Sequence, residues 1–349
     1  MNVLFKPIWF DSMGAKSSST LIKTDIKIVI DPGIAIMHQS FPASKEMKMK
    51  WKKEGKKRII KECKNANVII ISHYHHDHYI RDDLSIYYNK LLFMKNPNEY
   101  INESQRSRAE KFFRELLQRF KINFEEVLSK NKEKKYSLPL NELKIALKRD
   151  YGDYAERKKE IIENGIKWFE KQTMKWKMYE KIPELKINGT EIKFPEGKKF
   201  RIGETELRFT KPLFHGIEFS KVGWVFATII EYKGKKIIHT SDINGPIIED
   251  YAEWIIKEKP DILILDGPPT YMLGYMLNKI NLNRAIENAI KIIDESEAKL
   301  IIYDHHLPRE RKFREYTMKV WKFAEEKGAN LVTASEYMGK KTCCILRAL

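Results

Sequence analysis

The sequence predicts a layered α/β fold, and three observations support this prediction. The apolar run in Val68–Ser72 shows no alternation with polar residues, which is typical of a strand buried on both faces. In residues 187–349, apolar runs of strand length alternate with segments of helical periodicity. Hydrophobic residues make up 42% of the 349 residues, which suffices for a sizeable core and excludes a disordered chain.

Residues 1–79 are predicted to form strands around one helical segment. The strands are Leu21–Lys23, Ile26–Ile30 and Val68–Ser72, and Asp31-Pro32-Gly33 ends the second of them. The segment 45–64 carries ten Lys or Arg against three Asp or Glu, and we expect it to be helical. This first region is therefore the first half of the layered domain.

Residues 80–186 differ from the rest because charges are dense and glycine is nearly absent. Apolar residues recur there at helical spacing, which predicts amphipathic helices. One predicted face consists of Phe112, Leu116, Leu117 and Phe120, and another of Ile161, Ile162, Ile166 and Phe169. We therefore interpret 80–186 as a mostly helical insertion in a domain formed by 1–79 and 187–349.

Strands return after residue 187, and helices are expected near 282–297 and 308–327. The predicted strands are Glu191–Phe194, Glu206–Thr210, Trp224–Tyr232, Lys236–Thr240, Ile262–Leu265 and Leu300–Tyr303.

The segment His73-Tyr74-His75-His76-Asp77-His78 contains four of the nine histidines and directly follows a predicted buried strand. In a loop at a strand end, alternate side chains project toward one point, so His73, His75 and Asp77 can converge while His76 points away. Imidazole and carboxylate are ligands that suit zinc and similar divalent ions. A surface histidine cluster is the alternative, but an affinity tag is excluded because the segment is internal.

The pattern His73-x-His75-x-Asp77-His78 resembles the metal-binding signature of the metallo-β-lactamase superfamily. Further residues follow apolar runs in the order typical of that family: Asp31, His215, Asp242 and the pair His305-His306. The resemblance implies a four-layer αββα sandwich. The segment 80–186 additionally resembles the insertion of an archaeal group of predicted metal-dependent hydrolases.

The resemblance also implies a dinuclear site. One ion would be held by His73, His75 and His215, the other by Asp77, His78 and His305, and Asp242 would bridge them. His306 is the alternative to His305. We expect zinc, with manganese or iron as alternatives, and Asp77 and Asp242 as catalytic residues. Two such ions can share a hydroxide for hydrolysis, and His75 in place of a glutamate argues against a diiron redox centre.

Other residues are expected to support the ligands or the substrate. Asp31, Asp266, Asp304 and His239 are candidates for orienting ligand histidines, with ordinary capping or core roles as the alternative. Arg106, Arg108 and Arg309 are candidates for gripping an anionic substrate near the metals.

The net charge of +17 leaves three functional hypotheses open. The first is hydrolysis of an anionic small molecule with an ester, phosphodiester or lactone bond. The second is cleavage of RNA or DNA through the basic segment 45–64, in an open groove lined by Lys50, Lys53 and Lys57. The third is a non-catalytic, metal-stabilised scaffold or nucleic-acid-binding protein. The complete ligand set argues against the third, because a scaffold does not need an open dinuclear site. The first is the preferred hypothesis, with the nuclease as its alternative.

The sequence also gives expectations about cellular location and assembly. Three cysteines, the lack of a long apolar run and the lack of a secretory signal predict a cytoplasmic protein with no membrane partner. The abundance of Lys, Ile and Glu favours a thermophilic source. The insertion is expected to cap the metal cleft, and it could also mediate homo-oligomerisation.

Overall fold

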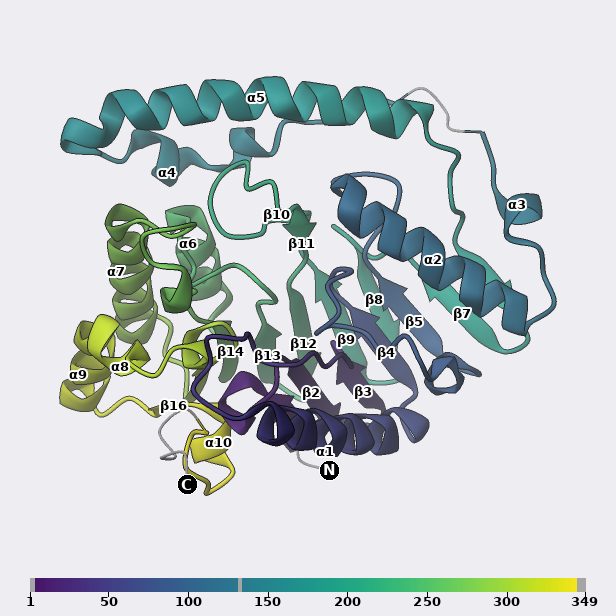
Figure 1. Cartoon of the computed structure of the whole chain (residues 1–349), viewed down its shortest axis with the longest axis horizontal. Coiled ribbons are helices and arrows are strands. Elements are labelled where there is room, and N and C mark those ends of the chain that lie inside the picture. Colours follow the sequence, from purple (N-terminus) through teal and green to yellow (C-terminus); the bar gives the residue numbers. More distant parts are fainter. Residues whose placement is uncertain (1–3, 131–133, 344–349) are drawn as a thin grey trace.

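The computed structural model describes residues 4–130 and 134–343, and two seven-stranded sheets dominate these residues (Figure 1). In spatial order, the first sheet consists of β1 (Leu4–Phe10), β2 (Ser18–Lys23), β3 (Lys27–Ile30), β4 (Val68–Ile71), β5 (Leu91–Met94), β7 (Thr190–Lys193) and β6 (Leu185–Ile187). The second consists of β16 (Leu331–Val332), β15 (Leu300–Asp304), β14 (Ile262–Asp266), β13 (Lys235–His239), β12 (Thr228–Tyr232), β9 (Thr205–Phe209) and β8 (Lys199–Ile202). A small ribbon pairs β10 (Leu213–Phe214) with β11 (Trp224–Val225).

The helices of the described residues vary widely in length. They are α1 (Lys45–Lys64), α2 (Glu103–Arg119), α3 (Phe124–Val127), α4 (Lys144–Lys148), α5 (Ala155–Met178), α6 (Glu249–Glu258), α7 (Lys279–Glu295), α8 (Phe313–Tyr316), α9 (Met318–Lys327) and α10 (Ala334–Tyr337). Short 3-10 turns include η1 (Asp11–Met13), η5 (Thr270–Met272) and η6 (Leu307–Arg309). None of the helices in the described ranges combines the length and the apolar character needed to cross a membrane.

Strand β4 shows how the layers are built. Its residues Val68 and Ile70 pack with Ile230 of β12 in a core between the two sheets. Its residue Ile69 faces the other way and packs with Ile59 of α1. Successive side chains of a strand point to opposite faces, so the uninterrupted apolar run reflects burial on both sides.

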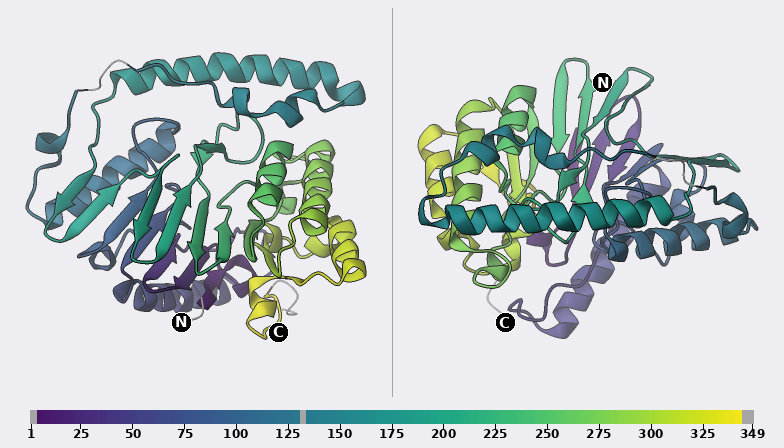
Figure 2. Two further views of the ribbon diagram at one scale, coloured as in Figure 1. Left: turned by 180° about the vertical axis from the view of Figure 1, so that it is seen from behind. Right: turned by 90° about the horizontal axis from the view of Figure 1, so that it is seen from above.

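Helices cover the outer face of each sheet (Figures 1 and 2). Helices α1 and α2 lie against the first sheet, and α6, α7 and α9 lie against the second. The order of layers is therefore helix, sheet, sheet, helix, which confirms the predicted four-layer αββα sandwich.

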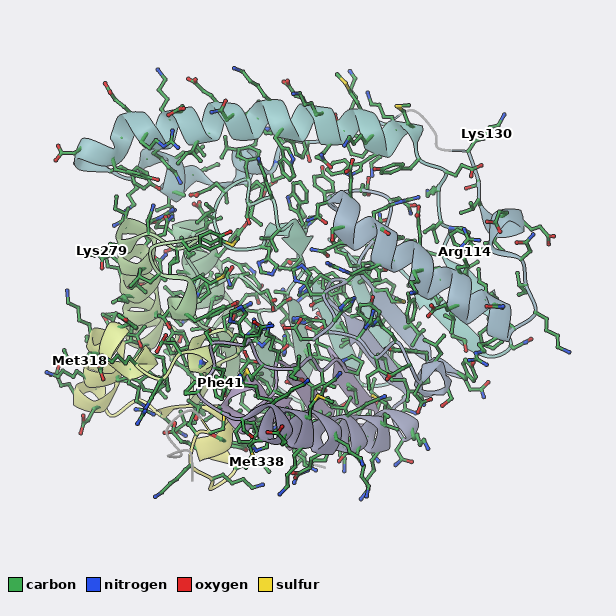
Figure 3. All side chains as sticks on the ribbon, in the orientation of Figure 1. Phe41, Arg114, Lys130, Lys279, Met318 and Met338 are labelled. Carbon is green, nitrogen blue, oxygen red and sulfur yellow. The ribbon has the colours of Figure 1, made fainter. Side chains whose placement is uncertain are left out.

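Helix α5 crosses one edge of the sandwich, from the α6–α7 side to the α2 side (Figure 2). Its outer side chains project away from the body (Figure 3). Its inner side approaches a loop closely, because a Cβ atom on Gly165 would lie 2.3 Å from the ring of Phe219. Trp168 stacks on Trp224 with ring centroids 5.3 Å apart and planes 9° apart. Helix α5 is therefore packed against the sandwich.

The structure differs from the predicted domain division in one respect. Strand β5 lies inside 80–186, yet it pairs in parallel with β4 and with β7 of the first sheet. Residues 91–94 are therefore part of the sheet and not of a helical insertion. A four-residue apolar run is hard to recognise among charged helices, and its partner β7 begins only at Thr190.

Candidate metal centre

The predicted ligands follow four strands that end at one edge of the sandwich. The segment from His73 to His78 follows β4, His215 follows β10, Asp242 follows β13, and His305 and His306 follow β15. Strands β13, β14 and β15 are parallel, so their carboxyl ends lie at the same edge of the second sheet. The sheet order thus brings together residues up to 233 positions apart, from His73 to His306.

The carboxylate of Asp242, which is 1% exposed, lies at the centre of this group. Four imidazoles surround it, and their Nε2 atoms point at its two oxygens. The distances from Asp242 Oδ2 are 3.4 Å to His73, 3.2 Å to His78 and 3.2 Å to His215, and Oδ1 lies 3.4 Å from His305.

The ligand atoms form three overlapping groups in which all atoms lie within 4.8 Å of one another. The groups are His73, His75, His215 and Asp242; Asp77, His78 and His305; and Asp242, His305 and His306. Within the part of the chain that is described, His215 Nε2 and Asp242 Oδ1 are buried and have no hydrogen-bond partner. Buried polar atoms without a partner are costly in a folded protein. The donor set and these two atoms therefore fit divalent cations on either side of Asp242.

A short hydrogen-bond chain orients His73. The Ser72 hydroxyl donates to Asp31 Oδ2 at 2.7 Å, so it can only accept from His73 Nδ1, which lies 3.1 Å away. The hydrogen of the His73 ring is then assigned to Nδ1, and Nε2 keeps its lone pair toward the cluster. Burial, reinforced by the neighbouring His78, lowers the pKa of His73 to about 4, so the ring is neutral at pH 7.

His78 and His215 are oriented by other side chains. Asp31 Oδ2 lies 2.9 Å from His78 Nδ1, and Asn244 Oδ1 lies 3.3 Å from His215 Nδ1. Burial alone would lower the pKa of His78, but Asp242 and Asp31 together raise it to about 10. A cation bound there would replace that proton, because a ligating imidazole is neutral.

His305 and His306 both reach the cluster. His305 Nδ1 lies 3.1 Å from the Ser17 carbonyl oxygen and 3.2 Å from Asp11 Oδ1. His306 Nδ1 lies 2.8 Å from Asp266 Oδ1, and its Nε2 lies 3.8 Å from Asp242 Oδ2. The geometry is compatible with either ring as a ligand, so the choice of His305 stays a prediction.

The expected supporting residues fall into two kinds. Asp31 and Asp266 contact rings of the cluster directly. Asp304 instead accepts from the backbone N–H groups of Ser12, Ala334 and His305, and His239 lies against the Ser18 carbonyl and the Ser241 N–H. These two shape the loops around the cluster. The sequence reasoning missed Asp11 and Ser72, which contact His305 and His73.

The three predicted substrate-binding arginines lie in different places. Arg106 is buried and donates to Glu110, to the Pro97 and Glu180 carbonyl oxygens and to Asn98. The expectation that Arg106 binds substrate is therefore wrong. Arg108 donates to the Tyr74 carbonyl at 3.3 Å and does not line the cavity at the cluster. Arg309 does line that cavity, where it pairs with Asp11 and, at 3.0 Å, with Asp77.

A cavity of about 730 Å³ opens onto the cluster. Its floor includes His75, Asp77, His215, His306 and Arg309. Helix α5 forms one wall, through residues that include Ile161, Gly165 and Trp168. This volume is in the range of small-molecule sites.

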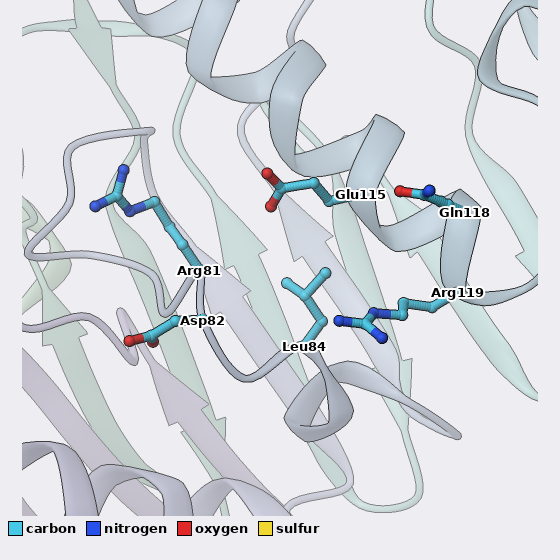
Figure 4. Close-up of a pocket in the computed structure, with 6 residues that line it drawn as sticks. All are labelled: Arg81, Asp82, Leu84, Glu115, Gln118 and Arg119. Atoms are coloured by element: carbon cyan, nitrogen blue, oxygen red, sulfur yellow. The ribbon is translucent and has the colours of Figure 1, made fainter.

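Two other hollows lie outside this site. Figure 4 shows one of about 450 Å³ that is lined by Arg81, Asp82, Leu84, Glu115, Gln118 and Arg119. Another is lined by α1 residues that include Lys57, Lys61 and Lys64. The lining of the metal cavity includes no residue of α1, so the expected groove of Lys50, Lys53 and Lys57 does not lie at the cluster.

The solved structures that resemble this chain have low sequence identity to it and modest structural similarity. The CmlA beta-hydroxylase, as a mutant, matches with a TM-score of 0.44 and 11% identity, covering 95% of this chain and 52% of that chain. The short form of human tRNase Z matches with a TM-score of 0.33 and 12% identity, covering 87% of this chain and 92% of that one. The metallo-beta-lactamase MIM-2 matches with a TM-score of 0.30 and 10% identity, covering 90% and 85%.

Sequence relatives match over nearly the whole chain, although no known protein-family model matches it. The UPF0282 protein of Methanopyrus kandleri is 30% identical over 352 residues, covering 96% of this chain and 94% of the relative. The UPF0282 protein of Methanocaldococcus jannaschii is also 30% identical, with coverage of 96% and 91%. The chain therefore belongs to the archaeal UPF0282 family.

Proposed function

We propose that this protein is a metal-dependent hydrolase that cleaves an ester, phosphodiester or lactone bond in a small anionic molecule. The observation that carries the proposal is the buried Asp242 carboxylate between four imidazole Nε2 atoms, beneath the floor of a cavity of small-molecule size. His73, His75 and His215 would hold one cation, and Asp77, His78 and His305 or His306 the other. We expect zinc, with manganese or iron as alternatives.

Two cations held there would lower the pKa of a shared water toward neutrality and polarise the bond under attack. Asp242, Asp77 and Arg309 have separate roles. Asp242 is buried beneath the floor and keeps the two halves of the cluster together. Asp77 lines the cavity, so its carboxylate is placed to accept a hydrogen bond from an attacking water and to orient it. Burial alone would raise the Asp77 pKa, but His78 and Arg309 hold it well below its usual range, and Arg309 donates to Asp77 Oδ2 at 3.0 Å.

The experiment combines metal analysis with a substrate panel. Purified protein is loaded with zinc, manganese or iron, and tested on bis-p-nitrophenyl phosphate, p-nitrophenyl phosphate, p-nitrophenyl acetate and a γ-lactone. We expect close to two ions per chain and cleavage of at least one substrate. His73→Ala should lower cleavage by about a hundredfold or more, because it removes a ligand.

His76→Ala is the matched control, because this ring lies in the same loop and lines a different hollow, with Lys52 and Lys56. It should keep nearly full cleavage. Less than one ion per chain, together with cleavage that His73→Ala leaves intact, would overturn the proposal.

A further inference from the structure

Most charged side chains that line the metal cavity are neutralised by a partner. Arg157 pairs with Glu160, Glu218 pairs with Lys158 and Arg284, and Arg309 pairs with Asp11 and Asp77. Lys16 is different: within residues 4–130 and 134–343, its ammonium group makes no ion pair and no hydrogen bond. Lys221 is the other such cation, but it is exposed at the rim, whereas Lys16 is half-buried.

The backbone around Lys16 is held in place from both sides. Its N–H donates to the Ala35 carbonyl, and its own carbonyl accepts from the Ala35 N–H, both at 2.9 Å. The next residue, Ser17, donates its N–H to Asp11 Oδ1 at 2.7 Å and presents its carbonyl to His305. Lys16 is therefore anchored to the same backbone that supports the cluster. Burial and then the nearby Arg309 lower the pKa of Lys16, against the opposite effect of Asp77 and Asp11, so the ammonium group lies in a poorly solvated place.

Another part of the lining is apolar. It includes Ile161 and Trp168 of α5, Phe219 of the loop before β11, and Met272 and Leu277 near η5. Trp168 is fixed by its stacking on Trp224. A rigid aromatic wall favours an apolar ligand surface, because burying it removes that surface from water at little cost in side-chain freedom.

We propose that Lys16 is a specificity-determining residue, which binds the carboxylate or phosphate of a substrate whose apolar body lies along the Trp168 wall. The substrate class is thus an amphipathic anion. This inference rests on the proposed function for its biological meaning, but the binding it describes uses only side chains of the chain itself. An ammonium group without a partner in a partly desolvated site gains most from an anionic ligand.

The test measures binding to the metal-free protein by calorimetry, so that hydrolysis plays no part. The probes are 2-naphthoate, 2-naphthylphosphonate, the neutral 2-naphthylmethanol and inorganic phosphate. We expect both naphthyl anions to bind more tightly than the alcohol, and phosphate alone to bind least. The naphthyl anion that binds more tightly identifies the head group.

Lys16→Met should weaken the binding of both naphthyl anions by about tenfold or more, and should change the affinity for the alcohol by less than about twofold. Lys16→Arg should keep most of the affinity, and Lys53→Met, on the exposed face of α1, is the matched control. Trp168→Leu should weaken the binding of all three naphthyl probes. A Lys16→Met protein that melts like the wild type and binds the anions equally well would overturn the inference, as would equal losses for anions and alcohol.

The two proposals fail in distinguishable ways. If binding of the naphthyl anions requires Lys16 but no metal binds, the amphipathic site is supported and the proposed hydrolase function is wrong. If two metals bind and esters are cleaved while Lys16→Met changes the affinity for no probe, the hydrolase function is supported and the proposed role of Lys16 is wrong.

Discussion

The Ser72 hydroxyl joins three parts of the cluster within hydrogen-bond distance. It donates to Asp31, accepts from the Ser241 hydroxyl at 2.7 Å, and lies 3.1 Å from His73 Nδ1. Asp31 in turn lies 2.9 Å from His78 Nδ1. One carboxylate therefore supports a ring in each half of the candidate metal site.

Asp31→Asn should weaken zinc binding about 10- to 100-fold, because an amide cannot support both rings as a carboxylate does. The measurement is competition with a fluorescent zinc chelator, with circular dichroism to verify the fold. Asp153→Asn, on an exposed turn, is the control and should bind zinc like the wild type. Unchanged zinc affinity in folded Asp31→Asn protein would contradict this role.

At the residue scale, the sequence revealed the candidate ligands because most of them directly follow apolar strands. It could not reveal Asp11, which reaches His305 across 294 positions, since that contact exists only in the folded chain. The error at Arg106 has a physical reason as well. Two of its four hydrogen-bond partners are backbone carbonyl oxygens, which carry no signature in a sequence of residue types.

At the element scale, an ion cluster attaches α5 to the loop that carries His215. Glu218 lies 2.5 Å from Lys158 of α5 and 2.7 Å from Arg284 of α7. Arg284 also pairs with Glu249 of α6 at 2.7 Å. The wall of the cavity and the adjoining part of the second helical layer are therefore joined through one buried carboxylate.

Glu218→Gln should lower the free energy of unfolding at pH 7 by on the order of 3 kcal/mol. Burial alone would raise the pKa of Glu218, but Arg284 and Lys158 lower it to about 2. Because its pKa is higher in the unfolded chain, wild-type stability should fall as the pH drops from about 4.5 toward 2. Urea unfolding between pH 7 and 3 measures this.

In Glu218→Gln protein, the fall in stability below pH 5 should be visibly shallower than in the wild type. Glu163→Gln, on the exposed side of α5, should follow the wild-type curve. Parallel curves for Glu218→Gln and the wild type would show that this carboxylate does not stabilise the fold in the way described.

At the scale of the whole molecule, the net charge of +17 is spread unevenly. Helix α1 has ten Lys or Arg and three Asp or Glu, yet it lies on the outside of the first sheet. Its residues line hollows other than the metal cavity. Because the basic residues of α1 do not line the metal cavity, their position does not support the nuclease alternative.

Replacing Lys50, Lys53 and Lys57 together by Ala should leave kcat/KM for a small anionic substrate within about twofold, since these side chains are not near the cavity. The rates should be compared at low and high salt. A steep loss of kcat/KM in the triple variant would show that the α1 surface takes part in substrate binding.

The overall sandwich was predictable to a large extent. Strands with an uninterrupted apolar run, such as β4 and β15, and the helix α1, lie where the sequence places them. Strands β1, β8 and β16 and helix α6 were not predicted, and β5 was assigned to the insertion. Strands β8 and β16 are short, and β8 is also polar, so local periodicity does not distinguish them from loops.

The central claim is that Asp242 bridges two divalent cations. A crystal structure of the zinc-loaded protein, with anomalous data at the zinc edge, tests it most directly. We predict two peaks, one beside His73, His75 and His215, and one beside Asp77, His78 and either His305 or His306. The absence of peaks at Asp242, or zinc bound only elsewhere on the molecule, would contradict the account.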